Sequence, residues 1–296
     1  MQLGIGMFSE HSKLQSTNEL IDRIHASSAA VVAIGLPTSK NSSHLRAESD
    51  APFRIARELL RDEGNPFAEN AKDLSGPDIF EYLGSAELES EDEFDRIRKI
   101  SATAFRSGKR PLFIGGDHSV TYPIVAGLSE VHGPVSILHF DAHPDLYDCF
   151  QDNPLSHASP FARILENGFA SSLWQFGIRT LTPHQCAQVR RFGVHCNEMR
   201  DHKRWKAPAF DGPVYVTVDL DALDPAFAPG VAHQEPGGMS VRDILDILNE
   251  CSGMVVGSDI VEYHPGRDVN GITAIVAAKL ARELVGRMDS DGGVRA

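Results

Sequence analysis

Three short runs of acidic residues and histidines each follow an apolar stretch of the chain. They are Gly115-Gly-Asp-His118, Asp141-Ala-His-Pro-Asp145 and Asp219-Leu-Asp221. Ionised side chains at the end of an apolar strand cost free energy to bury unless an opposite charge neutralises them. A single Asp-x-Asp pair also fits an ordinary turn or helix cap, but three such runs on successive strands favour one shared cation site.

The spacing within these runs predicts which way the side chains point. Asp141, His143 and Asp145 occupy alternate positions, so extended backbone directs all three to one side. Oxygen-rich ligation supplemented by imidazole, without a thiolate, suits Mn²⁺ better than Zn²⁺ or Mg²⁺. Six such ligands are enough to bridge two metal ions about 3.5–4 Å apart. His139 is expected to lie inside its strand and to point away from the site. The histidines without a surrounding motif are assigned to structure or surface: His132, His184, His195, His202 and His233.

Short β-rich segments alternate with helical patterns, which predicts a parallel sheet covered by helices on both faces. Ligands of such sheets bind beyond the carboxyl ends of the strands, where the three runs lie. The expected strands are Val31–Leu36, Pro111–Ile114, Val135–Phe140, Leu173–Ile178, Val214–Leu220 and Met254–Val261.

Helix signals and breakers complete this outline. A capping-box pattern at Ser90–Glu93 precedes a helix that ends at Gly108, Ser240 begins another helix, and a third contains Ile272 to Leu284. The stretch 37–43 is expected to be a loop, and the tail after Met288 to be frayed. Without an internal repeat or a low-complexity linker, residues 1–296 are expected to form a single domain.

Composition limits the class of protein. The chain has 296 residues, 42% hydrophobic and 23% charged, which is typical of a soluble globular protein. Its net charge of −13 disfavours a nucleic-acid partner and suits a small cationic ligand. The four cysteines form no CxxC pair, no signal-peptide pattern is present, and no apolar stretch approaches the roughly 18 residues of a membrane span. We therefore expect no membrane partner and a cytoplasmic location.

The three runs match, in order and spacing, the metal signatures of the ureohydrolase family, which contains arginases and agmatinases. The chain resembles this family from about Val31 to Arg287, including the segment Asp259–Asp268. The resemblance implies a three-layer α/β/α sandwich around a mainly parallel eight-stranded sheet, and assembly into trimers or hexamers. It also implies two Mn²⁺ ions per subunit, held by His118, Asp141, His143, Asp145, Asp219 and Asp221.

The resemblance further implies hydrolysis of a guanidinium group with release of urea. Glu262 matches the family's guanidinium-binding glutamate, Asp145 would hold the attacking water species and relay its proton, and His157 would protonate the leaving amine. The four aspartates offset the charge of two Mn²⁺ ions, so Glu262 and the nucleophile leave the pocket anionic. Such a pocket prefers a small cationic guanidino substrate.

Within the family the sequence most resembles plant-type arginases, which predicts conversion of L-arginine to L-ornithine and urea. Asn153 and Ser156 are the expected contacts of the substrate's α-amino acid group. An agmatinase or another guanidino-acid hydrolase remains open, because Asp148 and Asp152 near the pocket mouth favour a plain amine. A zinc deacetylase of the same fold is disfavoured because the chain has no His-His pair. A non-enzymatic metal-binding protein of this fold would have lost a ligand, and all six are present.

Overall fold

The centre of the molecule is one parallel sheet. The computed structural model describes residues 13–61, 64–88 and 92–291, and these form a nine-stranded sheet in the order β1-β3-β2-β4-β9-β8-β5-β6-β7. Every neighbouring pair is parallel. The strands are β1 (Leu14–Gln15), β2 (Val31–Gly35), β3 (Phe80–Ala86), β4 (Arg110–Ile114), β5 (Val135–Phe140), β6 (Ala170–Ile178), β7 (His195–Glu198), β8 (Pro213–Asp219) and β9 (Met254–Val261).

The six strands expected from the sequence are confirmed, with ends shifted by at most three residues. Three further strands, β1, β3 and β7, were not expected. The edge strand β7 reads His-Cys-Asn-Glu and has no buried residue, so it lacks the apolar run by which the others were recognised. The sheet has nine strands rather than the implied eight when the two-residue β1, which pairs with β3, is counted.

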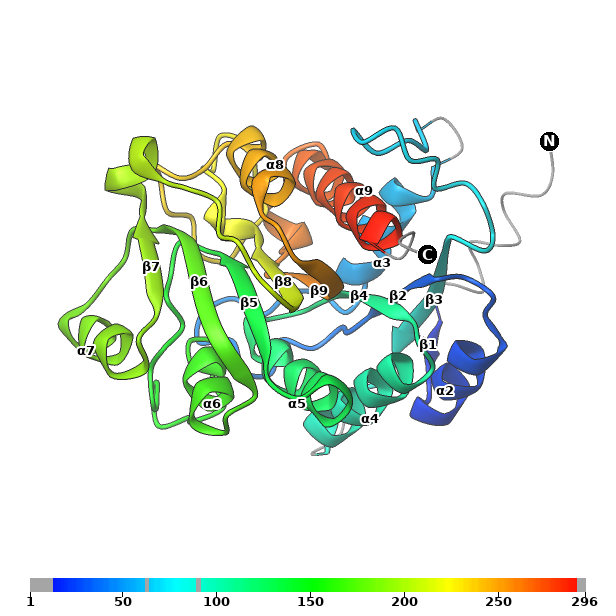
Figure 1. The fold of residues 1–296 in the computed structure, drawn as a ribbon, viewed down its shortest axis with the longest axis horizontal. Coiled ribbons are helices and arrows are strands. Elements are labelled where there is room, and N and C mark those ends of the chain that lie inside the picture. The colour runs from blue at the N-terminus through cyan, green and yellow to red at the C-terminus, as the bar shows by residue number, and fades with distance from the viewer. Residues whose placement is uncertain (1–12, 62–63, 89–91, 292–296) are drawn as a thin grey trace.

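Helices cover both faces of the sheet, which confirms the α/β/α sandwich (Figure 1). One layer contains α2, α4, α5, α6 and α7, and the other contains α3, α8 and α9. Their bounds are α2 (Thr17–Ala26), α3 (Ala51–Leu59), α4 (Glu93–Arg106), α5 (Thr121–His132), α6 (Pro160–Glu166), α7 (Pro183–Phe192), α8 (Val241–Glu250) and α9 (Ile272–Asp291). Short 3₁₀ helices lie at His118–Val120, Met199–Arg204, Leu220–Ala222 and Pro265–Arg267.

Each helical layer packs on its own hydrophobic cluster. One cluster joins Ile55 of α3 and Leu284 of α9 to the sheet, and the other joins Ile97 of α4 and Phe161 of α6 to its opposite face. Full burial of a side chain of this size contributes about 1.5–3 kcal/mol. Because the central strands are buried on both faces, their sequences are largely apolar without alternation, and the few polar residues within them, such as His139, Thr217 and Asp259, are buried.

The helix ends test the remaining local expectations. Ser240 is at the start of α8, as expected, and it caps the helix in a capping box with Asp243. The pattern at Ser90–Glu93 lies partly outside the described residues, and α4 begins at Glu93. The expectation of fraying directly after Met288 is wrong, because α9 continues to Asp291. The stretch 37–43 is a loop, as expected.

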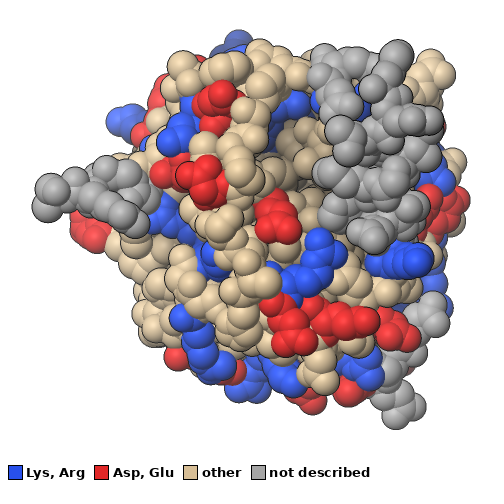
Figure 2. All heavy atoms as spheres, turned by 90° about the vertical axis from the view of Figure 1, so that its right-hand side faces the viewer, with Lys and Arg blue, Asp and Glu red and all other residues tan. Residues whose placement is uncertain are grey.

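The surface mixes charges of both signs. On the face in Figure 2, acidic and basic side chains lie beside one another rather than in separate patches. Interspersed charge of this kind favours solubility. Among the helices that the structure describes, none combines the length and the apolar character needed to cross a lipid bilayer.

Candidate metal centre

The candidate site lies at the carboxyl ends of four adjacent strands, β4, β9, β8 and β5. Because all pairs are parallel, these ends meet at one edge of the sheet. The chain leaves β4 toward His118, β5 toward Asp141, and β9 directly into Glu262, while Asp219 is the last residue of β8. Sheet topology thus brings together side chains from distant parts of the chain.

The turn after β4 depends on Gly116. A Cβ at this position would lie 1.5 Å from the carbonyl oxygen of Thr38, so no other residue fits without movement of backbone. The same turn accepts a hydrogen bond from the backbone N–H of Glu262 to Gly116 O at 2.8 Å, and Asp117 N donates to Thr38 O at 2.9 Å. Close backbone packing therefore fixes the backbone positions from which the side chains of His118 and Glu262 extend.

One group of side chains surrounds His118. Its Nδ1 lies 3.1 Å from Asp141 Oδ2, 3.1 Å from Asp145 Oδ2 and 3.2 Å from Asp219 Oδ2. The imidazole is fully buried, and among the described residues none of these contacts has hydrogen-bond geometry. Three carboxylate oxygens gathered around an unpaired imidazole nitrogen match the donor set of a divalent cation.

A second group surrounds His143 and shares one residue with the first. His143 Nδ1 lies 3.1 Å from Asp221 Oδ2 and 3.3 Å from Asp141 Oδ1. Asp141 therefore presents one carboxylate oxygen to the His118 group and the other to the His143 group. This bridging arrangement fits two neighbouring metal ions better than one.

His139 does not point away from the site, contrary to expectation. Its Nε2 lies 2.9 Å from Asp141 Oδ2, and its Nδ1 lies 3.0 Å from the Gln175 amide nitrogen, which also donates to Pro144 O. With Nδ1 accepting, Nε2 carries the proton and donates to Asp141. His139 therefore orients a carboxylate and offers no lone pair to a metal. The expectation failed because residues 139 and 141 are two apart and share one side of the strand.

The electrostatics show that the carboxylates need more positive charge than the chain supplies. Burial, reinforced by the charges of Asp221 and Asp141, raises the pKa of Asp219 well above its usual value, and burial raises the pKa of Asp221 to about 6. Burial acts on Asp141 in the same direction, but the three neighbouring imidazoles of His118, His139 and His143 outweigh it and hold that pKa well below its usual value. Without bound cations, the carboxylates must take up protons to reduce their negative charge. The site therefore fits divalent cations, which supply the positive charge instead.

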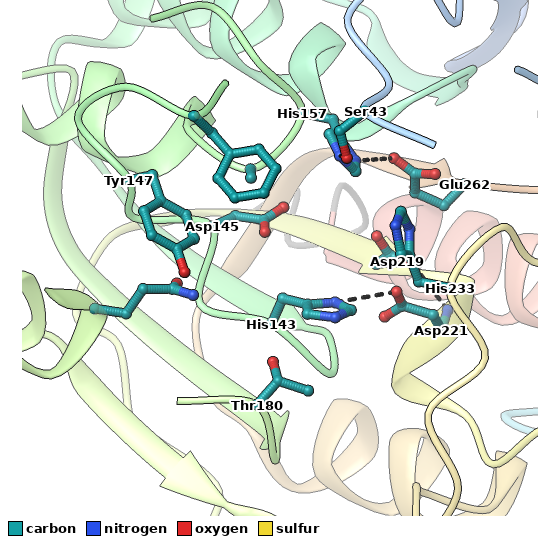
Figure 3. Close-up of a pocket in the computed structure, with 13 residues that line it drawn as sticks. Ser43, His143, Asp145, Tyr147, His157, Thr180, Asp219, Asp221, His233 and Glu262 are labelled. Carbon is teal, nitrogen blue, oxygen red and sulfur yellow. Dashed lines mark hydrogen bonds and ion pairs between the residues drawn. The ribbon is translucent and has the colours of Figure 1, made fainter. Parts of the chain in front are cut away.

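His157 and Glu262 form a pair beside the metal-binding groups (Figure 3). His157 Nδ1 lies 3.1 Å from Glu262 Oε1, and its Nε2 lies 2.8 Å from Ser43 Oγ. Burial alone would lower the pKa of His157, but the Glu262 carboxylate outweighs this effect and raises the pKa to about 9. The same Oε1 accepts from the backbone N–H of His118 at 2.9 Å. The pair is therefore a protonated imidazole held against a carboxylate.

Two of these residues have an unusual backbone. Glu262 has φ = 66° and Asp145 has φ = 50°, a region that non-glycine residues seldom occupy. Such conformations persist where surrounding contacts impose them, and they concentrate at functional sites.

A cavity of ≈ 160 Å³ connects the metal-binding groups with the His157–Glu262 pair. It contains the expected residues His143, Asp145, His157, Asp219, Asp221 and Glu262, and sequence reasoning missed the rest of its lining: Ser43, Tyr147, Phe150, Ala158, Thr180, Gln185 and His233. His118 and Asp141 are fully buried and are not among the described residues that line it. The His233 ring lies 5.4 Å from that of His157 and 5.9 Å from that of His143.

Asn153 and Ser156, the expected substrate contacts, are not among the described residues that line the cavity. The Asn153 amide donates to Asn41 Oδ1 at 3.0 Å and accepts from the backbone of Leu155 at 2.9 Å. Ser156 Oγ accepts from Ala158 N at 3.3 Å. Both side chains hold the loop between β5 and α6 in shape. A loop's turn geometry decides such orientations, and periodicity carries no signal for it.

Comparison with known proteins agrees with this site. A model of the arginase family matches residues 29–286. The chain is 41% identical over 301 residues to the protein named arginase 1, mitochondrial, of Arabidopsis thaliana, covering 95% of this chain and 87% of the relative. It is 37% identical over 208 residues to mitochondrial agmatinase of Gallus gallus, covering 66% and 61%. The solved arginase of Medicago truncatula superposes with a TM-score of 0.86 at 37% identity, covering 96% of each chain.

The same comparison corrects the expected location. The prediction of a cytoplasmic protein is wrong on this finding, because the similar arginases of Arabidopsis thaliana and Oryza sativa are named as mitochondrial proteins. The fold, the ordered motifs and the match over most of the length lead to one conclusion. The chain belongs to the arginase family, and it is most like the plant arginases.

Proposed function

We propose that this protein is a manganese-dependent arginase that hydrolyses L-arginine to L-ornithine and urea. The observation that carries the proposal is the position of Asp141, which turns one oxygen to the His118 group and the other to the His143 group, beside a protonated His157. Family membership and similarity to plant arginases support the reaction.

Two Mn²⁺ ions would be held by His118, Asp141, His143, Asp145, Asp219 and Asp221. Their shared Asp141 and the excess of buried carboxylates support a pair of ions. When bound, two such ions would lower the pKa of a water molecule in the cavity and so supply a nucleophile at neutral pH. Asp145 borders the cavity and is placed to accept a proton from that water.

Glu262 would bind the guanidinium. Both hydrogen bonds that Glu262 accepts from described residues reach Oε1, from His118 N and His157 Nδ1. Its Oε2 is thus left to accept N–H groups of the substrate. A planar guanidinium pairs well with a carboxylate, and the anionic cavity favours a cation.

His157 would supply the proton that the leaving amine needs. In the metal-free protein its pKa of about 9 keeps the imidazole protonated at neutral pH, and it borders the same cavity as Asp145. A positioned acid of this kind accelerates a reaction by about 10²–10⁴-fold. Ser43 accepts the second ring proton and holds the imidazole in place.

The outer wall of the cavity favours arginine over agmatine. Its polar members Tyr147, Thr180 and Gln185 are neutral hydrogen-bonding groups that accommodate an α-carboxylate. Of the two acidic residues that favour a plain amine, Asp148 and Asp152, the first lies with its Oδ1 3.1 Å from His184 Nε2. A charge-assisted hydrogen bond to the α-carboxylate is worth roughly 1.5–3 kcal/mol, or about 10- to 150-fold in preference.

We also propose that the chain is a single domain that assembles into trimers or hexamers. One sheet joins elements from β1 to β9, which supports a single domain. Val269, just before α9, and Ile272 and Ile275, three residues apart in its first turns, are 57%, 43% and 50% exposed. A patch of exposed apolar side chains is typical of a subunit interface.

Urea release from L-arginine, agmatine and 4-guanidinobutyrate tests both levels of the proposal. The Mn²⁺-loaded protein is expected to prefer arginine by about tenfold or more in kcat/KM. Gln185→Ala should reduce that preference, whereas Asn153→Ala, which changes a residue outside the cavity lining, should leave it unchanged. Agmatine as the preferred substrate would overturn the choice of arginine, and release of urea from none of the three would overturn the reaction.

A further inference from the structure

Asp259 is a buried carboxylate outside the metal-binding groups. It lies on β9, is fully buried, and stands opposite Thr217 of β8 in the register of the sheet. Its Oδ2 accepts hydrogen bonds from Thr121 Oγ1 at 2.8 Å and from Tyr215 Oη at 2.9 Å. The proposed reaction gives this residue no role, yet a buried carboxylate is costly unless its oxygens are paired.

The second carboxylate oxygen of Asp259, Oδ1, has a candidate donor nearby, the hydroxyl of Thr217. Among the described residues, Oδ1 has no hydrogen bond of good geometry. Burial raises the pKa of Asp259, and the Thr217 hydroxyl, on the residue paired with Asp259 in the sheet, acts in the opposite direction. The Thr217 side chain is fully buried as well, so its proton also needs an acceptor. The unpaired oxygen and the hydroxyl proton complement each other.

Thr217 also contacts the imidazole of His118, on the side away from the carboxylates. Its Oγ1 lies 3.1 Å from His118 Nε2, while His118 Nδ1 faces the oxygens of Asp141, Asp145 and Asp219. A neutral imidazole carries one proton, and the nitrogen without it is the one that binds a metal. A hydroxyl that donates to Asp259 accepts from Nε2–H, which leaves the lone pair on Nδ1.

We propose that Asp259 and Thr217 form a positioning relay that sets His118 in the tautomer required for metal binding. Asp259 Oδ1 accepts a hydrogen bond from the Thr217 hydroxyl. Thr217 Oγ1 in turn accepts a hydrogen bond from Nε2–H of His118, so Nδ1 presents its lone pair to the cation. This inference rests on the proposed metal site and extends it by two residues. A partner that orients the second nitrogen of a histidine ligand typically contributes 10- to 100-fold to metal affinity.

The opposite arrangement is disfavoured. If Thr217 donated to Nε2, the His118 proton would sit on Nδ1 and block the metal. Asp259 Oδ1 would then remain buried without a donor, at a cost of about 1–3 kcal/mol. The Thr121 hydroxyl, by contrast, donates to the Oδ2 oxygen of Asp259, and Thr121 reaches His118 only through its backbone N–H, which donates to His118 O and is kept in a valine variant.

Thr121 therefore provides a matched control. The Kd for Mn²⁺ is measured by calorimetric titration for wild type, Thr217→Val, Thr121→Val and Thr217→Ser, with folding checked by circular dichroism. Both valine variants remove a buried hydroxyl that faces Asp259, but only the first breaks the link to His118. We expect Thr217→Val to weaken binding by about 10- to 100-fold, Thr121→Val to bind as wild type does, and Thr217→Ser to retain tight binding.

The outcomes separate the relay from the metal site itself. The relay would be overturned if Thr217→Val and Thr121→Val bound Mn²⁺ with the same affinity, whether both bound as wild type does or both were weakened. A wild-type protein that binds no Mn²⁺ would overturn the proposed function instead. If Thr217→Val does not fold, Thr217→Cys replaces it, since a thiol is a weak hydrogen-bond acceptor and should also weaken binding.

Discussion

Replacement of Glu262 by glutamine should lower the pKa of His157 by two or more pH units. In the wild-type protein the pKa is about 9, compared with 6.5 for an unperturbed imidazole, because the Glu262 carboxylate outweighs the opposing effect of burial. At about 1.36 kcal/mol per pH unit, this difference corresponds to about 3 kcal/mol of preference for the charged form. Glutamine keeps the shape but removes the charge, so burial should then bring the pKa of His157 to 6.5 or below.

The assay is a ¹⁵N NMR titration of the His157 ring. It is carried out on metal-free protein, because bound cations would lower the pKa of His157 independently. Glu93→Gln is the matched control, since Glu93 is a buried glutamate that bonds Thr38 and Asn41 and not His157. An unchanged His157 pKa in Glu262→Gln, or an equal decrease in Glu93→Gln, would refute the reasoning.

The same pair makes the stability of the metal-free protein depend on pH. The folded-state pKa of His157, about 9, lies above the unfolded value of 6.5. Its contribution to the free energy of unfolding is therefore complete below pH 6.5 and is lost as the pH rises through 9. Glu262→Gln should abolish this component of the pH dependence, as measured by urea denaturation across that range.

Three further substitutions have defined outcomes. Asp219→Ala should lose bound Mn²⁺ and urea production, because it removes a ligand from a set of carboxylates whose charge offsets that of the metal ions. Full metal content with full activity would contradict the assignment of Asp219 as a ligand. His157→Ala should lower kcat by about 10²–10⁴-fold with a smaller change in KM, whereas an unchanged kcat with a raised KM would make it a binding residue. Gly116→Ala should lower the free energy of unfolding by about 3 kcal/mol or more, since its Cβ would collide with Thr38 O. Gly212→Ala, where a Cβ meets nothing within 4 Å, is the control and should change stability little in the same denaturation experiment.

The parts of the fold that could be predicted are those governed by burial. Strands such as β5 and β9 are buried on both faces, so their apolar runs predict them to the residue. The edge strand β7 is held by pairing with β6 rather than by burial, and its polar sequence resembles that of a loop. Hydrophobic periodicity reports packing, so an element held by backbone hydrogen bonds alone leaves little signal.

The candidate site likewise has a part that could be predicted from the sequence and a part that could not. The aspartates and histidines at strand ends could be recognised because strand periodicity and neutralisation of charge constrain them together. The cavity wall could not, since Tyr147, Gln185 and His233 come from three separate segments that only the tertiary fold brings together. Asn153 and Ser156 were expected to contact substrate from their place in the chain, but the turn geometry of their loop directs their polar atoms to neighbouring backbone and to Asn41.

Anomalous diffraction at the manganese edge, from crystals of the Mn²⁺-loaded protein, tests the central claim most directly. We predict two peaks per chain, about 3.5–4 Å apart. One should lie against His118 Nδ1 and the other against His143 Nδ1, with the carboxylate of Asp141 between them. A single peak, or manganese bound elsewhere with these residues empty, would contradict the account.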